Sequence, residues 1–391
     1  MTSFKALRYH GPGKIELEDV QRSYIDLYAI HYQTIVTNPL NSQCGPGEVR
    51  INVAFCGICG SDMHEYLAGP IFPPKIGKRD PNTGVSLPIT LGHEISGTFT
   101  ETGYDVTDFK VGQAITLNPS LNDRHYGLHP CLPCARGKQN LCQRMSYYGF
   151  SAEGGGLASE IVVETASCFA LPDGVSLEVG ALAEPLAIAW HSIRTSGFQK
   201  GQTALVLGAG PIGLATIMLL RYWGTQGIVV SEIAPSRSAL ARQFGADEVV
   251  NPLQRSHESF DATSPDPVVN AARTLDPEGV DVVFDATGLQ STLDTAIAAV
   301  KPAGTIYNVA IHEKPLLLNL NDLSGKEVKL LGGINCVRED FEGVLGSLAT
   351  GSIPAQKLIT SVVPLDQAVE KGFLELINNK SNYVKILIQP N

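Results

Sequence analysis

The stretch Thr203–Gly213 reads TALVLGAGPIG and decides the fold of about half the chain. Its apolar run TALVL reads as a strand, and the apolar run PIGLATIMLL that follows the glycines reads as a helix. Glycines spaced G-x-G-x-x-G between a strand and a helix permit a tight turn and a close approach of backbone N–H groups to a pyrophosphate. The stretch therefore predicts a dinucleotide site. Its expected cofactor contacts are Gly208, Gly210, Pro211, Ile212 and Gly213.

An acidic residue, Glu232, closes the next apolar run, GIVVSE. A carboxylate at this place accepts hydrogen bonds from ribose hydroxyls and repels a 2′-phosphate, so the sequence favours NAD over NADP. Arg237 follows five residues later and is a candidate to hold the adenosine end of the cofactor. The alternative is that the glycines only pack a helix on a sheet. The strand before them and the acid after them favour the cofactor site.

The residues around this motif alternate between apolar strand-like runs and helix-like runs, as in DVVFDATG, STLDTAIAAV and GTIYNVA. This alternation predicts a doubly wound parallel sheet, the Rossmann arrangement, over residues 186–336. Residues 1–185 carry short β-like runs between Gly and Pro, such as EVRINVAF and SEIVVE, which indicate a barrel-like antiparallel β domain. Residues 337–391 end in the strand-like NYVKILI, and we expect this segment to return to the first domain.

Residues 21–44, QRSYIDLYAIHYQTIVTNPLNSQC, interrupt what otherwise reads as one strand–turn–strand unit, ELEDV to GPGEVR. We interpret them as an inserted surface excursion. A long stretch of this kind is either functional or disordered.

The composition limits the partners and the compartment. The 391-residue chain is 43% hydrophobic and 17% charged, with a formal net charge of −10, which argues against a nucleic-acid partner. No uncharged apolar run reaches membrane-spanning length, and the start MTSFKALRYHG resembles neither a signal nor a transit peptide. Clustered cysteines in a large chain of this kind indicate metal chemistry in a reducing compartment, so we expect a cytoplasmic location.

Metal ligands gather in three short stretches. Residues 57–64 read GICGSDMH and residues 92–94 read GHE, and both combine ligand types that zinc accepts. A third cluster holds Cys131, Cys134 and Cys142.

These stretches, together with ALAEPLAIAWH and LGAGPIG, occur in the order found in zinc-containing medium-chain alcohol dehydrogenases. The chain resembles most the 2,3-butanediol dehydrogenase branch, through GSDMHEYLAGPIF, LPITLGHEISG and NVAIHEKPLLLNLNDL, with polyol dehydrogenases as near relatives. The resemblance covers essentially the whole chain apart from 21–44. It implies a GroES-like catalytic domain beside the Rossmann domain, with zinc and NAD as cofactors and the active site between the two domains.

The resemblance also implies roles for individual residues. Cys59 and His93 match the catalytic zinc ligands, and Asp62 matches a residue close to the metal and its histidine. Ser61 and His64 match the relay that carries the alcohol proton to solvent.

The third ligand has two candidates, Glu184 and Glu94. Adjacent side chains of an extended segment point to opposite faces, which favours Glu184 as the partner of His93, with Glu94 close by or exchanging.

The Cys131–Cys142 cluster departs from the family pattern C-x2-C-x2-C-x7-C, because its first position is Leu128. His129 or His125 would complete a Cys3His set for a structural zinc, and a lobe of three ordinary thiols without metal is the alternative.

The implied reaction moves a hydride from a small secondary alcohol, such as the vicinal diol 2,3-butanediol, to NAD, with acetoin as the product. A polyol dehydrogenase acting on sorbitol or xylitol is the first alternative, and a zinc-free nucleotide-binding relative is the second. The family also implies a homodimer or homotetramer, and we expect the strand GTIYNVAI and the following HEKPLLLNL to form its contact.

Overall fold

The computed structural model describes residues 3–21, 44–254, 266–312 and 314–391. The described chain forms two compact units, one ending at Glu184 and completed by Ile359–Asn391, the other spanning Pro185–Leu358. The excursion expected at 21–44 lies outside the described residues except for its two end positions. No helix among the described residues is long and apolar enough to cross a membrane.

The first unit is built mainly from antiparallel strands. Its large sheet has the order β10-β6-β5-β3-β18-β17, and β9 pairs with β3 as well. These strands are β3 (Glu48–Gly57), β5 (Glu94–Thr102), β6 (Ala114–Leu117), β9 (Glu160–Glu164), β10 (Cys168–Ala170), β17 (Ile359–Pro364) and β18 (Lys385–Gln389). Smaller sheets join β1 (Ser3–Gly11) to β2 (Lys14–Gln21) and β4 (Ile89–Thr90), and β7 (Ser120–Leu121) to β8 (Ser146–Tyr147). The short helices are α1 (Gly60–Ala68), α2 (Leu132–Ala135), α3 (Leu177–Gly180) and α11 (Leu374–Asn378).

The end of β3 is the place where distant segments of this unit meet. Gly57, its last residue, pairs with Glu94 of β5 on one side and with Leu387 of β18 on the other. The residues just after β3 therefore lie beside those just before β5 and beside the start of β18. Around them, alternate residues such as Val49, Ile51 and Val53 of β3 are fully buried in the core of the unit.

The second unit contains a six-stranded sheet with the order β13-β12-β11-β14-β15-β16. All of its strand pairs are parallel, and numbered within the unit the order is 3-2-1-4-5-6, as in dinucleotide-binding Rossmann folds. The strands are β11 (Thr203–Leu207), β12 (Gly227–Ser231), β13 (Glu248–Val250), β14 (Val280–Asp285), β15 (Val300–Asn308) and β16 (Lys329–Gly332). This topology confirms the predicted α/β class.

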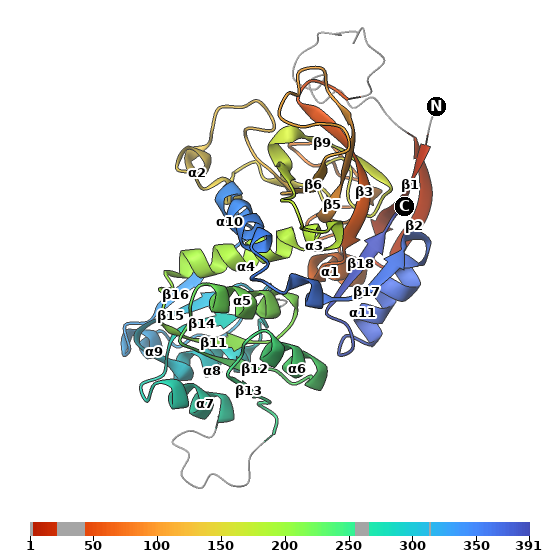
Figure 1. Cartoon of the computed structure of the whole chain (residues 1–391). Coiled ribbons are helices and arrows are strands. Elements are labelled where there is room, and N and C mark those ends of the chain that lie inside the picture. The colour runs from red at the N-terminus through yellow and green to blue at the C-terminus, as the bar shows by residue number, and fades with distance from the viewer. Residues whose placement is uncertain (1–2, 22–43, 255–265, 313) are drawn as a thin grey trace. The chain divides into compact units, whose positions relative to one another are not determined.

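Helices cover both faces of this sheet (Figure 1). Buried residues of α7 and α8 pack against one set of alternating strand residues, including Leu205 and Val283, while α5 lies on the opposite face. The helices are α4 (Ala183–Ser196), α5 (Pro211–Tyr222), α6 (Pro235–Gln243), α7 (Pro267–Leu275), α8 (Gln290–Ala299), α9 (Leu320–Ser324) and α10 (Arg338–Ala349). A strand buried on both faces must be apolar throughout, which is why TALVL carries no alternation.

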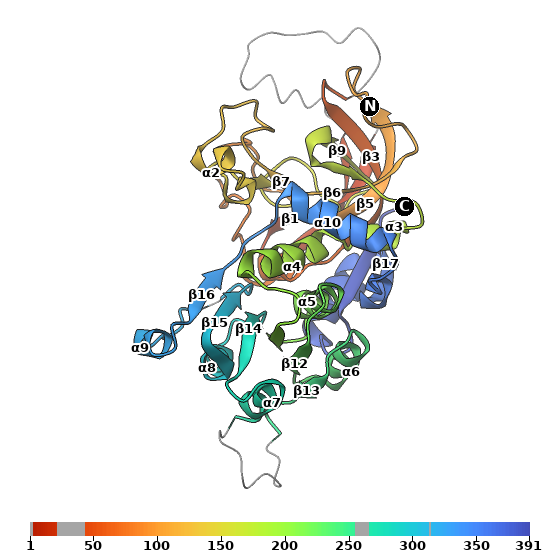
Figure 2. The same ribbon diagram turned by 60° about the vertical axis from the view of Figure 1, so that its left-hand side comes forward.

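Two expectations about this unit change. The strand GTIYNVAI is β15, which pairs with β14 and β16, so it lies inside the sheet and β16 forms the edge (Figure 2). The segment that returns to the first unit begins at Ile359 and not at residue 337. Residues 337–358 stay with the second unit because α10 is bound to α4, where Asp340 accepts hydrogen bonds from Arg194 and pairs with His191.

Candidate functional site

Cys59, His93 and Glu94 come together at the end of β3. Cys59 directly precedes α1, whereas His93 and Glu94 lie where β5 begins. One ligand atom from each residue lies within 4.8 Å of the others. His93 and Glu94 are buried and Cys59 is half-buried. The Cys59 thiolate and the His93 imidazole are donors that zinc accepts, and a neighbouring carboxylate would complete a set of three protein ligands.

Asp62 orients this set from the first turn of α1. Its Oδ2 accepts a hydrogen bond from the Cys59 backbone N–H at 2.9 Å, and its Oδ1 lies 3.6 Å from His93 Nδ1. Neither Oδ1 nor Nδ1 has a hydrogen-bond partner, although both atoms are buried. Burial disfavours a charged His93, but the Asp62 carboxylate and Cys59 outweigh it and raise the pKa of His93. A carboxylate facing one ring nitrogen leaves the other, Nε2, directed toward a metal.

The two glutamates differ in their surroundings. Glu94 is fully buried, and both of its oxygens accept hydrogen bonds from Lys385 Nζ, at 2.6 and 2.7 Å. Glu184, in the first turn of α4, is also buried, and burial raises the pKa of its carboxyl, while the nearby His93 acts in the opposite direction. Glu184 therefore lies in the electrostatic field of the cluster. Its carboxylate does not belong to the group of ligand atoms, from Cys59, His93 and Glu94, that lie within 4.8 Å of one another.

The two expected relay residues share one face of α1, since Ser61 and His64 are three positions apart. Ser61 Oγ lies 3.3 Å from His93 Nε2, the ring nitrogen that Asp62 does not face. His64 is half-buried. The helix thus places a hydroxyl at the donor set and an imidazole one turn further on.

Two aromatic rings pack next to His93, one directly and the other through the first. The Phe150 ring lies 4.7 Å from the His93 ring, and the Phe72 ring lies 5.4 Å from that of Phe150, measured between centroids. Phe150 is almost fully buried. The imidazole is therefore bordered by an apolar wall made of side chains from the same unit.

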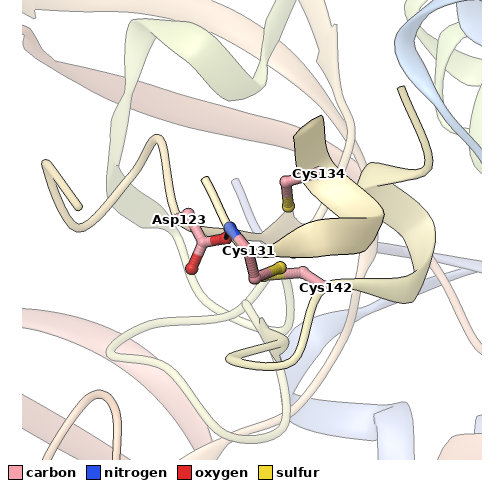
Figure 3. A group of neighbouring side chains, drawn as sticks. All are labelled: Asp123, Cys131, Cys134 and Cys142. Carbon is pink, nitrogen blue, oxygen red and sulfur yellow. Dashed lines mark hydrogen bonds between the residues drawn. The ribbon is translucent and has the colours of Figure 1, made fainter. Parts of the chain in front are cut away.

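The second cluster gathers four residues around α2, namely Asp123, Cys131, Cys134 and Cys142 (Figure 3). Their ligand atoms all lie within 4.8 Å of one another. Cys131 Sγ and Cys142 Sγ are 3.9 Å apart, far from a disulfide bond length. Two sulfurs bound to zinc at about 2.3 Å with a tetrahedral angle between them would be about 3.8 Å apart. This donor set therefore fits a tetrahedral metal.

Asp123 takes the place for which a histidine was expected. Its Oδ2 accepts a hydrogen bond from the Cys131 backbone N–H at 2.7 Å, and its Oδ1 pairs with Arg144. Burial opposes its ionisation, but these bonds prevail and lower the pKa of the carboxyl. Neither histidine belongs to the cluster: His125 bonds to Ser167 and Asn122, and His129 is exposed on the surface. The chain at residue 123 folds back onto the thiols, so Asp123 lies beside them in place of either histidine of the possible Cys3His set.

The glycine loop lies between β11 and α5 as predicted. Gly208 has a φ of 88°, and a Cβ on Gly213 would lie 1.9 Å from the Gly208 carbonyl oxygen, so both positions require glycine. Gly210 caps α5, and Pro211 and Ile212 form its first turn. Free N–H groups at the N-terminus of a helix suit an anionic group such as a pyrophosphate.

Glu232 follows β12 and supports this loop directly. Its Oε2 accepts a hydrogen bond from the Ala209 backbone N–H at 2.7 Å, and its Oε1 accepts from Ile233 and Ala234 at 2.9 and 2.8 Å. Arg237, half-buried in the first turn of α6, lies within electrostatic range of Glu232.

Two residues of these clusters, Lys385 and Asp123, were not predicted from the sequence. The only sequence signal for Lys385 was a charged residue inside the apolar strand NYVKILI. Asp123 lies outside the family's ligand spacing and had no signal.

Comparison with known proteins agrees with this architecture. Residues 45–173 match the family described as alcohol dehydrogenase GroES-like domain, and residues 211–350 match the family described as zinc-binding dehydrogenase. An (R,R)-butanediol dehydrogenase from Saccharomyces cerevisiae is 40% identical over 357 residues, which cover 88% of this chain and 91% of that protein. The "Probable D-xylulose reductase A" of Aspergillus fumigatus is 31% identical, covering 93% of this chain and 95% of that protein.

Among solved structures, 2R,3R-butanediol dehydrogenase from Bacillus subtilis superposes with a TM-score of 0.83 at 35% identity, covering 99% of this chain and 100% of that one. The chain therefore belongs to the zinc-dependent alcohol dehydrogenase family, whose members are oxidoreductases acting on CH–OH groups. Zinc and a nicotinamide dinucleotide are its cofactors.

Proposed function

We propose that this enzyme oxidises a small vicinal diol, 2,3-butanediol, to acetoin, with NAD as the hydride acceptor. The observation that carries the proposal is the apolar wall of Phe150 and Phe72 beside His93. The methyl groups of a short diol suit such a wall. The additional hydroxyls of sorbitol or xylitol would lose hydrogen bonds to water there and gain none. The similarity to butanediol dehydrogenases from two organisms supports the same substrate.

In this proposal Cys59, His93 and one glutamate hold the catalytic zinc. A bound zinc ion would lower the pKa of the substrate hydroxyl. Ser61 accepts the proton of that hydroxyl at Oγ and passes it toward His64, which delivers it to solvent. Asp62 orients the His93 ring. We favour Glu184 as the third ligand, because Lys385 already compensates the charge of Glu94.

At the nucleotide site, the residues Gly208 to Gly213 bind the pyrophosphate. Glu232 receives the adenosine ribose, with Arg237 beside it.

A substrate panel tests the assignment. Zinc-loaded protein is assayed with the three stereoisomers of 2,3-butanediol, with sorbitol and with xylitol, each with NAD and with NADP. We expect kcat/KM to be highest for a 2,3-butanediol isomer with NAD. A preference for sorbitol or xylitol would establish the polyol dehydrogenase alternative. Protein that binds no zinc during loading and turns over none of these substrates would establish the zinc-free alternative.

We also propose that Asp123, Cys131, Cys134 and Cys142 hold a structural zinc. The support is the 3.9 Å sulfur–sulfur distance and the carboxylate directed at the thiols. Metal analysis should then give two zinc ions per chain in the wild type and one in Asp123→Ala. His125→Ala and His129→Ala are the matched controls and should keep two. One zinc ion in the wild type would refute the lobe site.

For the assembly we propose a homodimer or homotetramer that pairs through β16. This edge strand and the segments beside it expose large apolar side chains, including Leu330, Ile334, Leu317 and Leu320. An uncovered apolar edge promotes aggregation unless a symmetric partner covers it. Light scattering on dilute protein tests this, and a fully active monomer would contradict it. We further propose a cytoplasmic location, which suits the eight unbridged cysteines.

A further inference from the structure

A buried lysine from the far end of the chain holds one of the two glutamates of the metal cluster. Lys385 is the first residue of β18 and is 2% exposed. Its Nζ donates to both oxygens of Glu94, at 2.6 and 2.7 Å, and to the Ile58 carbonyl oxygen at 3.1 Å. The ammonium group has three protons, so these three acceptors use all of them.

The surrounding backbone is shaped to this pair. A Cβ added to Gly57 would lie 1.9 Å from Glu94 Oε2. Gly57 does not adopt a positive φ, so its requirement for glycine comes from the carboxylate and not from the backbone conformation. The fold therefore reserves space for Glu94 in the position that faces Lys385.

The same carboxylate lies next to the metal ligands. One Glu94 oxygen is within 4.8 Å of the ligand atoms of both Cys59 and His93. Glu94 is thus placed between two cationic partners, the Lys385 ammonium and a zinc ion held by Cys59 and His93. A buried carboxylate that loses one cationic partner is strongly driven toward the other.

We propose that Lys385 is a positioning residue that keeps Glu94 away from the zinc, so that the position facing the substrate stays open. The proposal rests on the metal-ligand assignment made above. Without the lysine, Glu94 becomes a zinc ligand and competes with the alcohol. The C-terminal strand therefore controls the coordination of a metal whose ligands lie about three hundred residues earlier in the chain.

The test uses protein in which Co²⁺ replaces zinc at the Cys59–His93 site, because the visible absorption of Co²⁺ reports its ligand number without any substrate. The variants are Lys385→Met, Lys385→Arg, Glu94→Gln and the double variant Lys385→Met/Glu94→Gln. Lys385→Met should change the Co²⁺ spectrum to that of a site with an added oxygen ligand. It should also release metal to a chelator more slowly than the wild type, because one more protein ligand must dissociate.

The other variants separate positioning from a merely structural role. Lys385→Arg keeps the cation and should retain the wild-type spectrum. The double variant lacks the carboxylate and should return to the wild-type spectrum, although Lys385 is absent from it as well. Glu94→Gln nearly preserves the side-chain shape, and by itself it should leave the spectrum unchanged.

Two results would overturn the proposal. One is a Lys385→Met spectrum identical to that of the wild type, which would mean that Glu94 stays away from the metal without the lysine. The other is an altered spectrum in Glu94→Gln alone, which would make Glu94 a resident ligand. Neither result depends on turnover. A wrong substrate assignment would appear in the substrate panel and leave these spectra unaffected.

Discussion

Replacing Glu232 with alanine should alter cofactor choice and weaken the nucleotide loop at the same time. The Glu232 carboxylate accepts three backbone hydrogen bonds, from Ala209, Ile233 and Ala234. Ile233 is exposed and Ala234 half-buried, so water can replace the carboxylate at their N–H groups. Ala209 is fully buried, and an unsatisfied buried donor costs about 1–3 kcal/mol. We expect the cofactor-free variant to lose about that much free energy of unfolding.

The charge of Glu232 acts on the cofactor itself. A carboxylate at the ribose hydroxyls gains hydrogen bonds from NAD and repels the extra phosphate of NADP. Each 1.4 kcal/mol of this difference is about tenfold in kcat/KM. We expect a wild-type preference for NAD of about a hundredfold or more, which falls at least tenfold in Glu232→Ala.

The assay measures kcat/KM with both cofactors and, separately, the denaturation midpoint without cofactor. Glu248→Ala is the matched control, because Glu248 is an exposed acid at the start of the neighbouring strand β13. It should change neither quantity. Equal wild-type efficiency with NAD and NADP would refute the role of Glu232, and so would an unchanged ratio in the alanine variant.

Three further changes have defined outcomes. His64→Ala should lower turnover mainly near neutral pH and recover in part at high pH, where hydroxide accepts the proton; a loss independent of pH would indicate a positioning role. Burial and Glu48 raise the pKa of Glu164 to about 8. In the unfolded chain this carboxyl ionises from about pH 4.5, while in the folded protein it stays protonated. The free energy of unfolding should therefore fall between about pH 4.5 and 8, by up to about 1.4 kcal/mol per pH unit. Glu164→Gln should abolish this loss and raise the melting temperature at pH 8.5 but not at pH 4, and equal melting shifts at both pH values would contradict the account. Deletion of residues 21–44 should leave turnover nearly unchanged, and a large fall in zinc content, assembly or activity would show that the segment packs on the enzyme.

Local sequence determined the nucleotide-binding half of this protein almost completely. The run TALVL, the glycines and Glu232 lie within thirty residues of one another, and each constraint acts between near neighbours. A tight turn that needs Gly208 and a helix that begins at Pro211 are properties of short segments, so their spacing alone predicted them. The same holds for Ser61 and Asp62, which one helical turn orients relative to Cys59.

The tertiary structure decided what depends on segments that meet across the chain. Asp123 joins the three cysteines because a loop folds back on them, and the spacing of ligands in the sequence does not predict such a fold. Lys385 reaches Glu94 only because β18 pairs with the end of β3, beside which β5 begins. Strand order made β16 the edge of the sheet, whereas β15, the strand that the family resemblance had indicated for the subunit contact, lies inside it. Sequence periodicity reports which side of an element is apolar, whereas the identity of the segment packed against it is set by the chain's long-range path.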